Sequence, residues 1–222
     1  MSLRCSECSG EVRPVVAIDI DGTLGDYHAH FLRFATEWLG NDLVPLLDAS
    51  LNGYDGTIRF SEYCERIFGI DLSTYRQIKL AYRQGGMKRS MPIFQESYET
   101  VARIFFAGAE VWVTTTRPYL SLDNIVPDTV EWCRRHNIDY DGMLFDEDKY
   151  GQLAERVDPE RVVAVIDDLP EMCEAANEYF DSAAILAARP YNGGSDIVSR
   201  LGLARAGIVA ATRTREWIDG HS

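Results

Sequence analysis

The segment VVAIDIDGTL, residues 15–24, decides which fold the chain adopts. Val15–Ile18 is short, apolar and rich in β-branched residues, which is typical of a parallel strand buried on both faces. Asp19 and Asp21 follow this strand, and Gly22 begins a turn. Open α/β sheets bind their ligands at the carboxyl ends of the strands. We therefore interpret residues 15–24 as a strand that leads into a ligand site.

The two carboxylates at this strand end predict a metal ion. Burying Asp19 and Asp21 without a neutralising cation is costly, and a hard cation with oxygen ligands, Mg²⁺, meets that need. A lone D-x-D sequence is also compatible with a solvated acidic turn. The full D-x-D-G-T motif after four apolar residues resembles the nucleophile motif of the haloacid dehalogenase-like (HAD) phosphohydrolases. This resemblance implies that Asp19 attacks phosphorus to form an aspartyl-phosphate, while Asp21 protonates the leaving group and later activates water.

Two later segments resemble the next HAD motifs in family order. The strand EVWVTTT, residues 110–116, ends on hydroxyls, and the resemblance gives Thr115 the role of binding the phosphoryl group. Thr114 is the competing choice, because a one-residue slip turns a side chain to the opposite face. Arg117 follows at the mouth of the expected cleft. Lys149 matches the lysine that neutralises the nucleophile and the phosphoryl oxygens, although a lysine among acids is also an ordinary solvated charge cluster.

The segment VVAVIDDLP, residues 162–170, repeats the form of the opening strand. It resembles the fourth HAD motif, which implies that Asp167 completes the Mg²⁺ ligands together with Asp19 and the backbone carbonyl of Asp21. The same resemblance implies that Asp168 orients the loop and supports these ligands. Four motifs in family order predict a Rossmann-like, three-layer α/β/α fold with a mostly parallel sheet.

The long stretch between the first two motifs predicts an inserted cap. Apolar residues recur at helical spacing from Phe31 to Leu39, and further helices are expected at 60–68 and 73–84. We predict a flexible tail at 1–14, a catalytic core at 15–25 and 95–222, and a helical cap of the C1 type at 26–94. Such a cap excludes water and selects the leaving group.

Further core elements are expected toward the carboxyl end of the chain. Pro127 is placed for the first position of a helix that runs to about His136, and a final strand is expected at 182–188. Residues 197–217 are helix-like in parts and give no functional signal.

Two cap segments suggest a nucleotide substrate. The sequences GDY at 25–27 and GGMKRSMPIF at 85–94 are similar to the corresponding parts of 5′(3′)-deoxyribonucleotidases. In the second segment, Lys88 and Arg89 are candidates for contacting phosphate. Cap aromatics are candidates for stacking on a base, although a helical cap also packs its own rings; these are Tyr27, Phe31, Tyr54 and Tyr82.

Composition restricts the partners and the compartment. The net charge of −13 argues against extended nucleic acid and against an anionic membrane. No apolar run reaches the roughly 20 residues of a membrane span, and residues 1–14 lack the apolar core of a signal peptide, so we expect a cytoplasmic protein with reduced thiols. Cys5 and Cys8 form half a zinc site, which His28 and His30 complete only if the tail folds back; a mobile tail with free thiols is the alternative.

The predicted function is a Mg²⁺-dependent phosphomonoester hydrolase that acts on small phosphorylated substrates, above all nucleoside or deoxynucleoside monophosphates. Sugar and cofactor phosphates are alternatives. A 3′-phosphatase acting on nucleic-acid ends is another, since residues 117–132 are loosely similar to polynucleotide kinase phosphatase domains. A non-catalytic binding module is disfavoured because Asp19 and Asp21 are both intact. The sequence holds neither a Gly-rich phosphate loop nor a G-x-S-x-G elbow, and it does not indicate an oligomeric state.

Overall fold

A single parallel sheet forms the centre of the protein. The computed structural model describes residues 12–40, 53–116, 121–181, 183–193 and 200–221. Within these residues, six strands lie in the order β3-β2-β1-β4-β5-β6, and each neighbouring pair is parallel. They are β1 (Val15–Ile18), β2 (Glu110–Thr115), β3 (Gly142–Phe145), β4 (Val162–Asp167), β5 (Ala184–Ala187) and β6 (Arg200–Leu201). The strand that carries the opening motif therefore lies inside the sheet, hydrogen-bonded on both edges.

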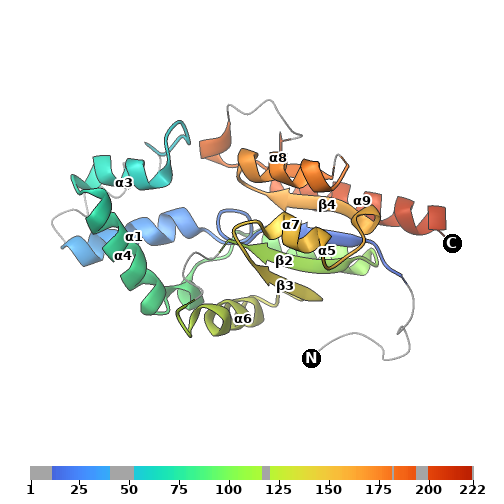
Figure 1. The fold of residues 1–222 in the computed structure, drawn as a ribbon, viewed down its shortest axis with the longest axis horizontal. Helices are drawn as coiled ribbons and strands as arrows, with labels where there is room; N and C mark the ends of the chain where they lie inside the picture. Colours follow the sequence, from blue (N-terminus) through green and yellow to red (C-terminus); the bar gives the residue numbers. More distant parts are fainter. Residues whose placement is uncertain (1–11, 41–52, 117–120, 182, 194–199, 222) are drawn as a thin grey trace.

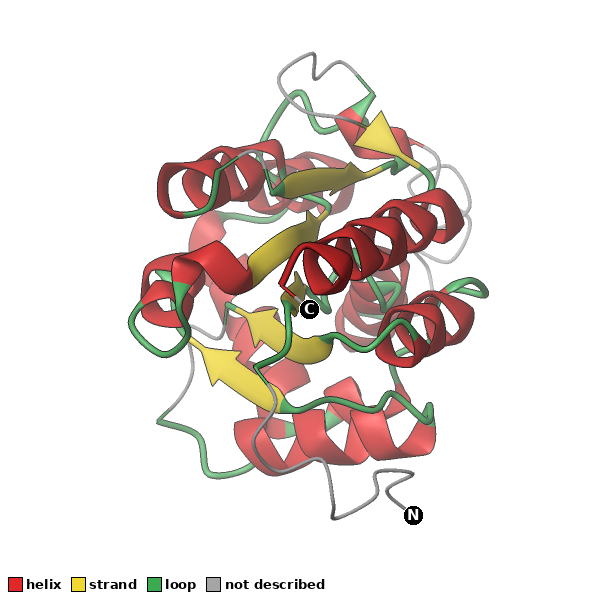
Figure 2. Ribbon diagram, turned by 90° about the vertical axis from the view of Figure 1, so that its right-hand side faces the viewer, coloured by secondary structure: helices red, strands yellow, loops and turns green. Residues whose placement is uncertain are grey.

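Helices cover both faces of this sheet (Figure 2). Val16 and Ile18 of β1 belong to the core beneath α5 (Ser97–Phe106), α6 (Ile125–Arg135) and α9 (Leu203–His221). Val15 and Ala17 point to the opposite core, beneath α7 (Lys149–Ala154) and α8 (Pro170–Tyr179). All four strand residues are fully buried, which explains why the segment is apolar throughout instead of alternating. The predicted three-layer α/β/α fold is confirmed.

Three helices gather beyond one end of the sheet (Figure 1). This is the end at which β1 finishes and the chain continues toward α1. The three helices are α1 (Tyr27–Leu39), α3 (Phe60–Phe68) and α4 (Leu72–Gln84), and the short 3₁₀ helix η2 (Met87–Ser90) leads back toward the core. Asp26 and Asp71 cap α1 and α4 by accepting from the backbone amides of Ala29 and Thr74. The helix predicted at 60–68 has these bounds, and the one predicted at 73–84 begins one residue earlier.

The helical layer touches the core through a glycine. Gly56 has φ +75°, and a Cβ placed on it would lie 1.7 Å from the carbonyl oxygen of Tyr191. Tyr191 belongs to the short helix η4 (Pro190–Asn192), and its ring centroid lies 5.3 Å from that of Tyr54. Only glycine combines this left-handed backbone with such a close approach. The contact brings the loop before α3 against η4 of the core.

The structure corrects three sequence-based expectations about the core. Helix α6 begins at Ile125, so Pro127 is its third residue; the first amides of a helix have no intrahelical partner, which makes proline acceptable there. The last strand, predicted at 182–188, is β5 and spans only Ala184–Ala187. Helix α9 is continuous, and its pattern is weak in the sequence because it packs on α5 through small residues. A Cβ on Gly207 would lie 2.9 Å from Thr100 Cγ2.

The other short element in the described chain is η3 (Pro159–Arg161), which precedes β4. None of the helices that the structure describes combines the length and the apolarity needed to cross a bilayer.

Candidate active site

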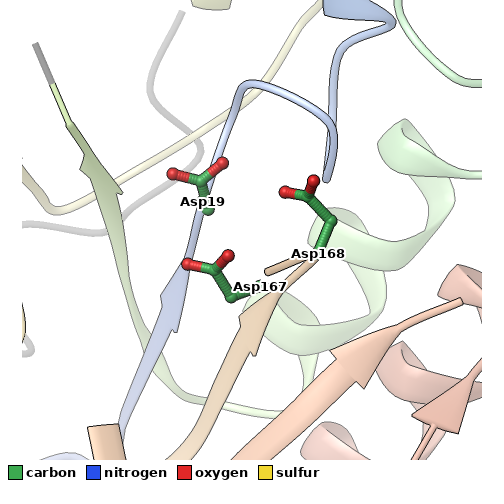
Figure 3. Close-up of side chains that lie close together, drawn as sticks. All are labelled: Asp19, Asp167 and Asp168. Carbon is green, nitrogen blue, oxygen red and sulfur yellow. The ribbon is translucent and has the colours of Figure 1, made fainter. Parts of the chain in front are cut away.

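Three buried carboxylates meet at the carboxyl ends of β1 and β4. Asp19 continues β1, its backbone amide donating to the carbonyl of Ile166 at 3.0 Å, whereas Asp167 is the last residue of β4 and Asp168 follows it (Figure 3). Each offers a carboxylate oxygen, and these oxygens all lie within 4.8 Å of one another. Asp19, the most accessible of the three, is only 6% exposed. Two strands that are adjacent in the sheet thus bring together residues from opposite ends of the sequence.

Lys149 connects two of these carboxylates. It is the first residue of α7, which Asp148 caps by accepting from the amide of Gly151 at 3.1 Å. Its Nζ lies 2.6 Å from Asp19 Oδ1 and 2.6 Å from Asp167 Oδ2, and the residue is 2% exposed. The lysine that the resemblance pointed to is therefore a buried member of the cluster and not a solvated charge.

The hydroxyl of Tyr150 adds a neutral donor, at 2.5 Å from the same oxygen of Asp167. The backbone amide of Leu169 donates to the other oxygen of Asp167 at 3.0 Å. Sequence reasoning missed Tyr150, although its position next to Lys149 in the first turn of a helix was a usable signal.

Asp168 is held by a different set of donors. Thr23 Oγ1 and the hydroxyl of Tyr191 donate to its carboxylate at 3.0 and 2.7 Å. Asn192 Nδ2 donates to its backbone carbonyl at 2.8 Å. Arg189 in turn donates to two backbone carbonyls of the loop after β1, at 2.6 and 2.5 Å. Asp168 therefore connects the β4 end with the loop of the first motif, as its predicted orienting role requires; that role stays a prediction.

Burial and mutual repulsion dominate the electrostatics of the cluster. Desolvation raises the pKa of Asp19 to about 7. The attraction of Lys149 opposes this increase, and the repulsion of Asp167 adds to it. Desolvation and the nearby charges of Asp167 and Asp19 raise the pKa of Asp168 well above its usual value. Desolvation alone would lower the pKa of Lys149, but the attraction of Asp167 and Asp19 outweighs it, and the net shift is upward. The site therefore stabilises additional positive charge.

The residues present fit a divalent cation. One ammonium, that of Lys149, contacts Asp19 and Asp167, whereas Thr23 and Tyr191 donate to Asp168 through neutral hydroxyls. Three carboxylates against one ammonium leave a deficit of positive charge in a buried site, and oxygen donors are the ligands that Mg²⁺ prefers. Asp168 joins Asp19 and Asp167 as a candidate ligand. The backbone carbonyl of Asp21 stays a predicted ligand.

The side chain of Asp21 lines the same cavity as this cluster and pairs with two cations of the cap. Its Oδ1 pairs with Lys88 Nζ, and its Oδ2 pairs with Arg83 Nη2 at 3.2 Å. Lys88 Nζ also lies 5.2 Å from the ring centroid of Trp132. Lys88 thus reaches the first motif through Asp21. Arg89 lies elsewhere, half exposed and 3.2 Å from Asp128 of α6.

Arg83 was not predicted from the sequence. Its guanidinium lies over the rings of Tyr27 and Tyr82, at 5.3 and 5.6 Å from their centroids, and the residue is 4% exposed. Its Nε and Nη1 have no hydrogen-bond partner among the described residues. Burying donors of a charged group without hydrogen-bond partners costs free energy. Groups in such unfavourable environments are common in ligand-binding sites.

The predicted phosphoryl ligand at the end of β2 lies beside the cluster. Thr115 is fully buried, lines the same cavity as Asp19, and its hydroxyl has no partner within the described chain. Thr114 is also buried and unpaired but does not line the cavity. The predicted substrate ligand Arg117, like Cys5 and Cys8, lies outside the described residues.

Two adjacent cavities lie between the cap and the core. The inner one, of about 210 Å³, contains the catalytic candidates. The outer one, of about 940 Å³, opens between α3, α4 and α8. Four residues line both cavities, namely Tyr27, His28, Lys79 and Leu169.

The cap aromatics have separate positions. Tyr27 and Tyr54 line these cavities, whereas Phe31 and Tyr82 are fully buried and cannot contact a ligand in this conformation. His28 packs against Tyr191 at 4.6 Å between ring centroids, and burial lowers its pKa to about 4. His30 shares a 2.8 Å hydrogen bond with the hydroxyl of Tyr82. Its other ring nitrogen, Nε2, lies 3.4 Å from Ser90 Oγ.

Comparison with known proteins identifies the fold. No family model matches the chain, and no curated protein matches its sequence. Among solved structures, a candidate β-phosphoglucomutase from Thermotoga maritima is similar, with TM-score 0.57 at 16% identity over 88% of this chain and 97% of that one. A candidate haloacid dehalogenase-like hydrolase from Bacteroides fragilis has TM-score 0.56 at 16% identity, over 87% and 99% of the two chains.

CbbY from Rhodobacter sphaeroides, in complex with phosphate, has TM-score 0.54 at 16% identity, over 88% of this chain and 97% of that one. At these identities the similarity shows the fold alone, and that fold is the one of the HAD-like hydrolases. The fold named from the sequence motifs is thus confirmed.

Proposed function

We propose that the protein is a Mg²⁺-dependent phosphomonoester hydrolase that works through an aspartyl-phosphate. The observation that carries this proposal is the arrangement of Asp19, which lies at a strand end, is 2.6 Å from Lys149 and shares a cavity with the unpaired hydroxyl of Thr115. A carboxylate nucleophile, a cation and an unpaired donor together suit an incoming phosphoryl group. The HAD-like fold, and the phosphate bound to CbbY, support the same chemistry.

The proposed reaction has two balanced steps. In the first, an oxygen of Asp19 attacks phosphorus, the bond between phosphorus and the ester oxygen breaks, and that oxygen takes a proton from Asp21. In the second, Asp21 removes a proton from water, the resulting hydroxide attacks phosphorus, and inorganic phosphate leaves as Asp19 is restored. Lys149 and Thr115 stabilise the phosphoryl oxygens throughout.

A bound Mg²⁺ would be held by Asp19 and Asp167, with Asp168 beside them, and would offset charge on the phosphoryl oxygens.

Asp21 must change partners during this reaction. Both of its carboxylate oxygens are paired in the structure, one with Lys88 and one with Arg83. Asp21 has to release one of these cations and take up a proton before it can protonate the ester oxygen of the substrate. Since Lys88 and Arg83 both belong to the segment that carries the cap, substrate entry and the release of Asp21 are coupled in the proposed mechanism.

We further propose a nucleoside or deoxynucleoside monophosphate as the substrate. The support is the outer cavity, whose 940 Å³ accommodates a drug-sized ligand and whose wall includes the rings of Tyr54, Phe60 and Tyr75. The similarity of residues 25–27 and 85–94 to deoxyribonucleotidases points the same way. The contact between Gly56 and Tyr191 crosses the face that a duplex end would have to approach, which disfavours the 3′-phosphatase alternative.

The decisive experiment combines one substitution with a substrate panel. Asp19→Asn preserves the shape of the nucleophile but removes the attacking oxyanion, so phosphate release from p-nitrophenyl phosphate should stop while the circular dichroism spectrum is unchanged. EDTA should silence the wild type reversibly. The panel compares nucleoside monophosphates, sugar phosphates and 3′-phosphorylated oligonucleotides. If Asp19→Asn keeps activity near the wild-type level, Asp19 is not the nucleophile. If the enzyme prefers 3′-phosphorylated oligonucleotides, the nucleotidase proposal is wrong.

A further inference from the structure

The cavity-lining face of α4 carries positive charge along its whole length. Arg76, Lys79 and Arg83 follow one another at intervals of three and four residues, which places them on one face of the helix. Arg76 lines the outer cavity, Lys79 lines both cavities, and Arg83 lines the inner one. We call these three residues the α4 cationic face. It runs continuously from the opening of the outer cavity to the side of Asp21.

This face is an exception to the charge of the molecule. The chain has a net charge of −13, but α4 contains these three cations and no acidic residue. Burial increases along the face, because Arg76 is exposed, Lys79 is half-buried and Arg83 is buried. A row of cations that becomes progressively desolvated attracts anions from solvent and holds them more strongly toward its inner end.

The other walls of the outer cavity are mainly acidic. Glu62 and Glu65 of α3 and Glu171 of α8 line it, and Glu62 is paired with Arg66 at 2.6 Å. Arg59, just before α3, adds one cation to the same wall as Glu62 and Glu65. An anion in this cavity is therefore attracted most strongly by α4, which contributes cations and no acidic residue. Charge thus determines the side on which an anionic ligand lies, which is along α4.

Together with the unpaired donors of Arg83, these observations assign a chemical class to the substrate. We propose that the α4 cationic face binds a second anionic group, phosphate or carboxylate, of a phosphomonoester whose scissile phosphate lies at Asp19. This rests on the proposed phosphomonoester hydrolysis; a nucleoside monophosphate has no second anionic group, so the inference favours a nucleoside bisphosphate or another doubly anionic phosphomonoester in its place. Lys79 and Arg76 lie about 6 and 10 Å beyond Arg83 along the helix axis, at about 1.5 Å per residue, so the second group lies several bonds away from the scissile ester.

The first test compares substrates that differ only in the second anionic group. Three pairs separate its possible sources: adenosine 3′,5′-bisphosphate with adenosine 5′-monophosphate, fructose 1,6-bisphosphate with fructose 6-phosphate, and 3-phosphoglycerate with glycerol 3-phosphate. In at least one pair, wild-type kcat/KM for the compound with the second anion should be higher by about tenfold or more, as one charged hydrogen bond allows.

The second test assigns that preference to α4. In Lys79→Met, kcat/KM for the preferred compound should fall about tenfold or more, mainly through KM, while its partner changes less than about twofold. Lys79→Arg should restore most of the loss because it keeps the charge. Arg33→Met is the matched control, since Arg33 is an exposed cation of the cap that lines neither cavity; it should leave both compounds unchanged.

Two results would overturn the inference: equal wild-type kcat/KM within every pair, or an equal loss for both members of a pair in Lys79→Met. A failure of the proposed function looks different, because then no phosphomonoester is hydrolysed. In that case, calorimetric titration of Asp19→Asn with the same pairs in Mg²⁺ tests the inference through binding alone. Tighter binding of the compounds with two anionic groups supports it, provided that this preference is lost when Lys79→Met is added to Asp19→Asn. Equal affinities within each pair refute it.

Discussion

Replacing Lys149 by methionine tests whether this ammonium offsets the charge of the carboxylate cluster. Lys149 is 2% exposed and contacts Asp19 and Asp167 at 2.6 Å each. Removing one partner of a buried ion pair costs about 3–5 kcal/mol, because the other charge stays buried without compensation. For a chain of this size, each kcal/mol lowers Tm by about 2–4 °C, which gives a loss of about 6–20 °C in EDTA.

The assay is urea unfolding of Lys149→Met and of wild type, in EDTA and in saturating Mg²⁺. Because the ion supplies positive charge to the same carboxylates, the difference between the two proteins should be smaller in Mg²⁺ than in EDTA. Tyr150→Phe is the matched comparison, since it removes a neutral donor from the same oxygen of Asp167 and should cost about 1–3 kcal/mol with little dependence on Mg²⁺. If Lys149→Met costs no more than Tyr150→Phe in EDTA, the charge argument is wrong.

Two further predictions concern the contact between cap and core and the effect of pH. Gly56→Ala should lower the free energy of unfolding by about 2–5 kcal/mol in urea titrations, from left-handed strain plus overlap with the Tyr191 carbonyl. Gly69→Ala, also at positive φ but with open space around it, should cost only about 1–2 kcal/mol, and equal losses would contradict the overlap. Burial lowers the pKa of His28 from 6.5 to about 4. As pH falls, the unfolded chain therefore takes up a proton at His28 before the folded protein does. The contribution of His28 to stability is full above pH 6.5 and declines as pH falls toward 4. His28→Gln should therefore lose about 3 kcal/mol less than wild type between pH 7 and pH 4, and parallel pH profiles would count against the shift.

The parts of the site that the sequence predicted are those attached to strand ends. Asp19 and Asp167 each follow an apolar run, and the carboxyl ends of adjacent parallel strands must meet, so their proximity follows from the pattern. Lys149 was found through its resemblance to a motif, and the structure places it between them.

The parts that were missed depend on tertiary placement. Arg83 is the next-to-last residue of a cap helix, and nothing in its local sequence shows that it will reach Asp21, which is 62 positions away. Tyr191 contacts Asp168 from a short helix that follows β5, in a segment without periodicity. Arg89 was proposed beside Lys88, but neighbouring residues on a short 3₁₀ helix point in different directions, and only Lys88 reaches Asp21. Helix α9 was hidden by its small interfacial residues.

The interior position of β1 has a consequence for how the protein is made. Val15 to Ile18 pair on one edge with β2, which begins at Glu110, and on the other edge with β4, which begins at Val162. A nascent chain that has not yet reached residue 162 carries Asp19 at the end of a strand with one open edge, and it lacks two of the three buried carboxylates. Such an edge is prone to pairing with other chains, and non-local pairing of this kind is slow. The first motif to leave the ribosome is therefore among the last to become a site, and a truncated translation product would contain Asp19 and Asp21 but would be inert and prone to aggregate.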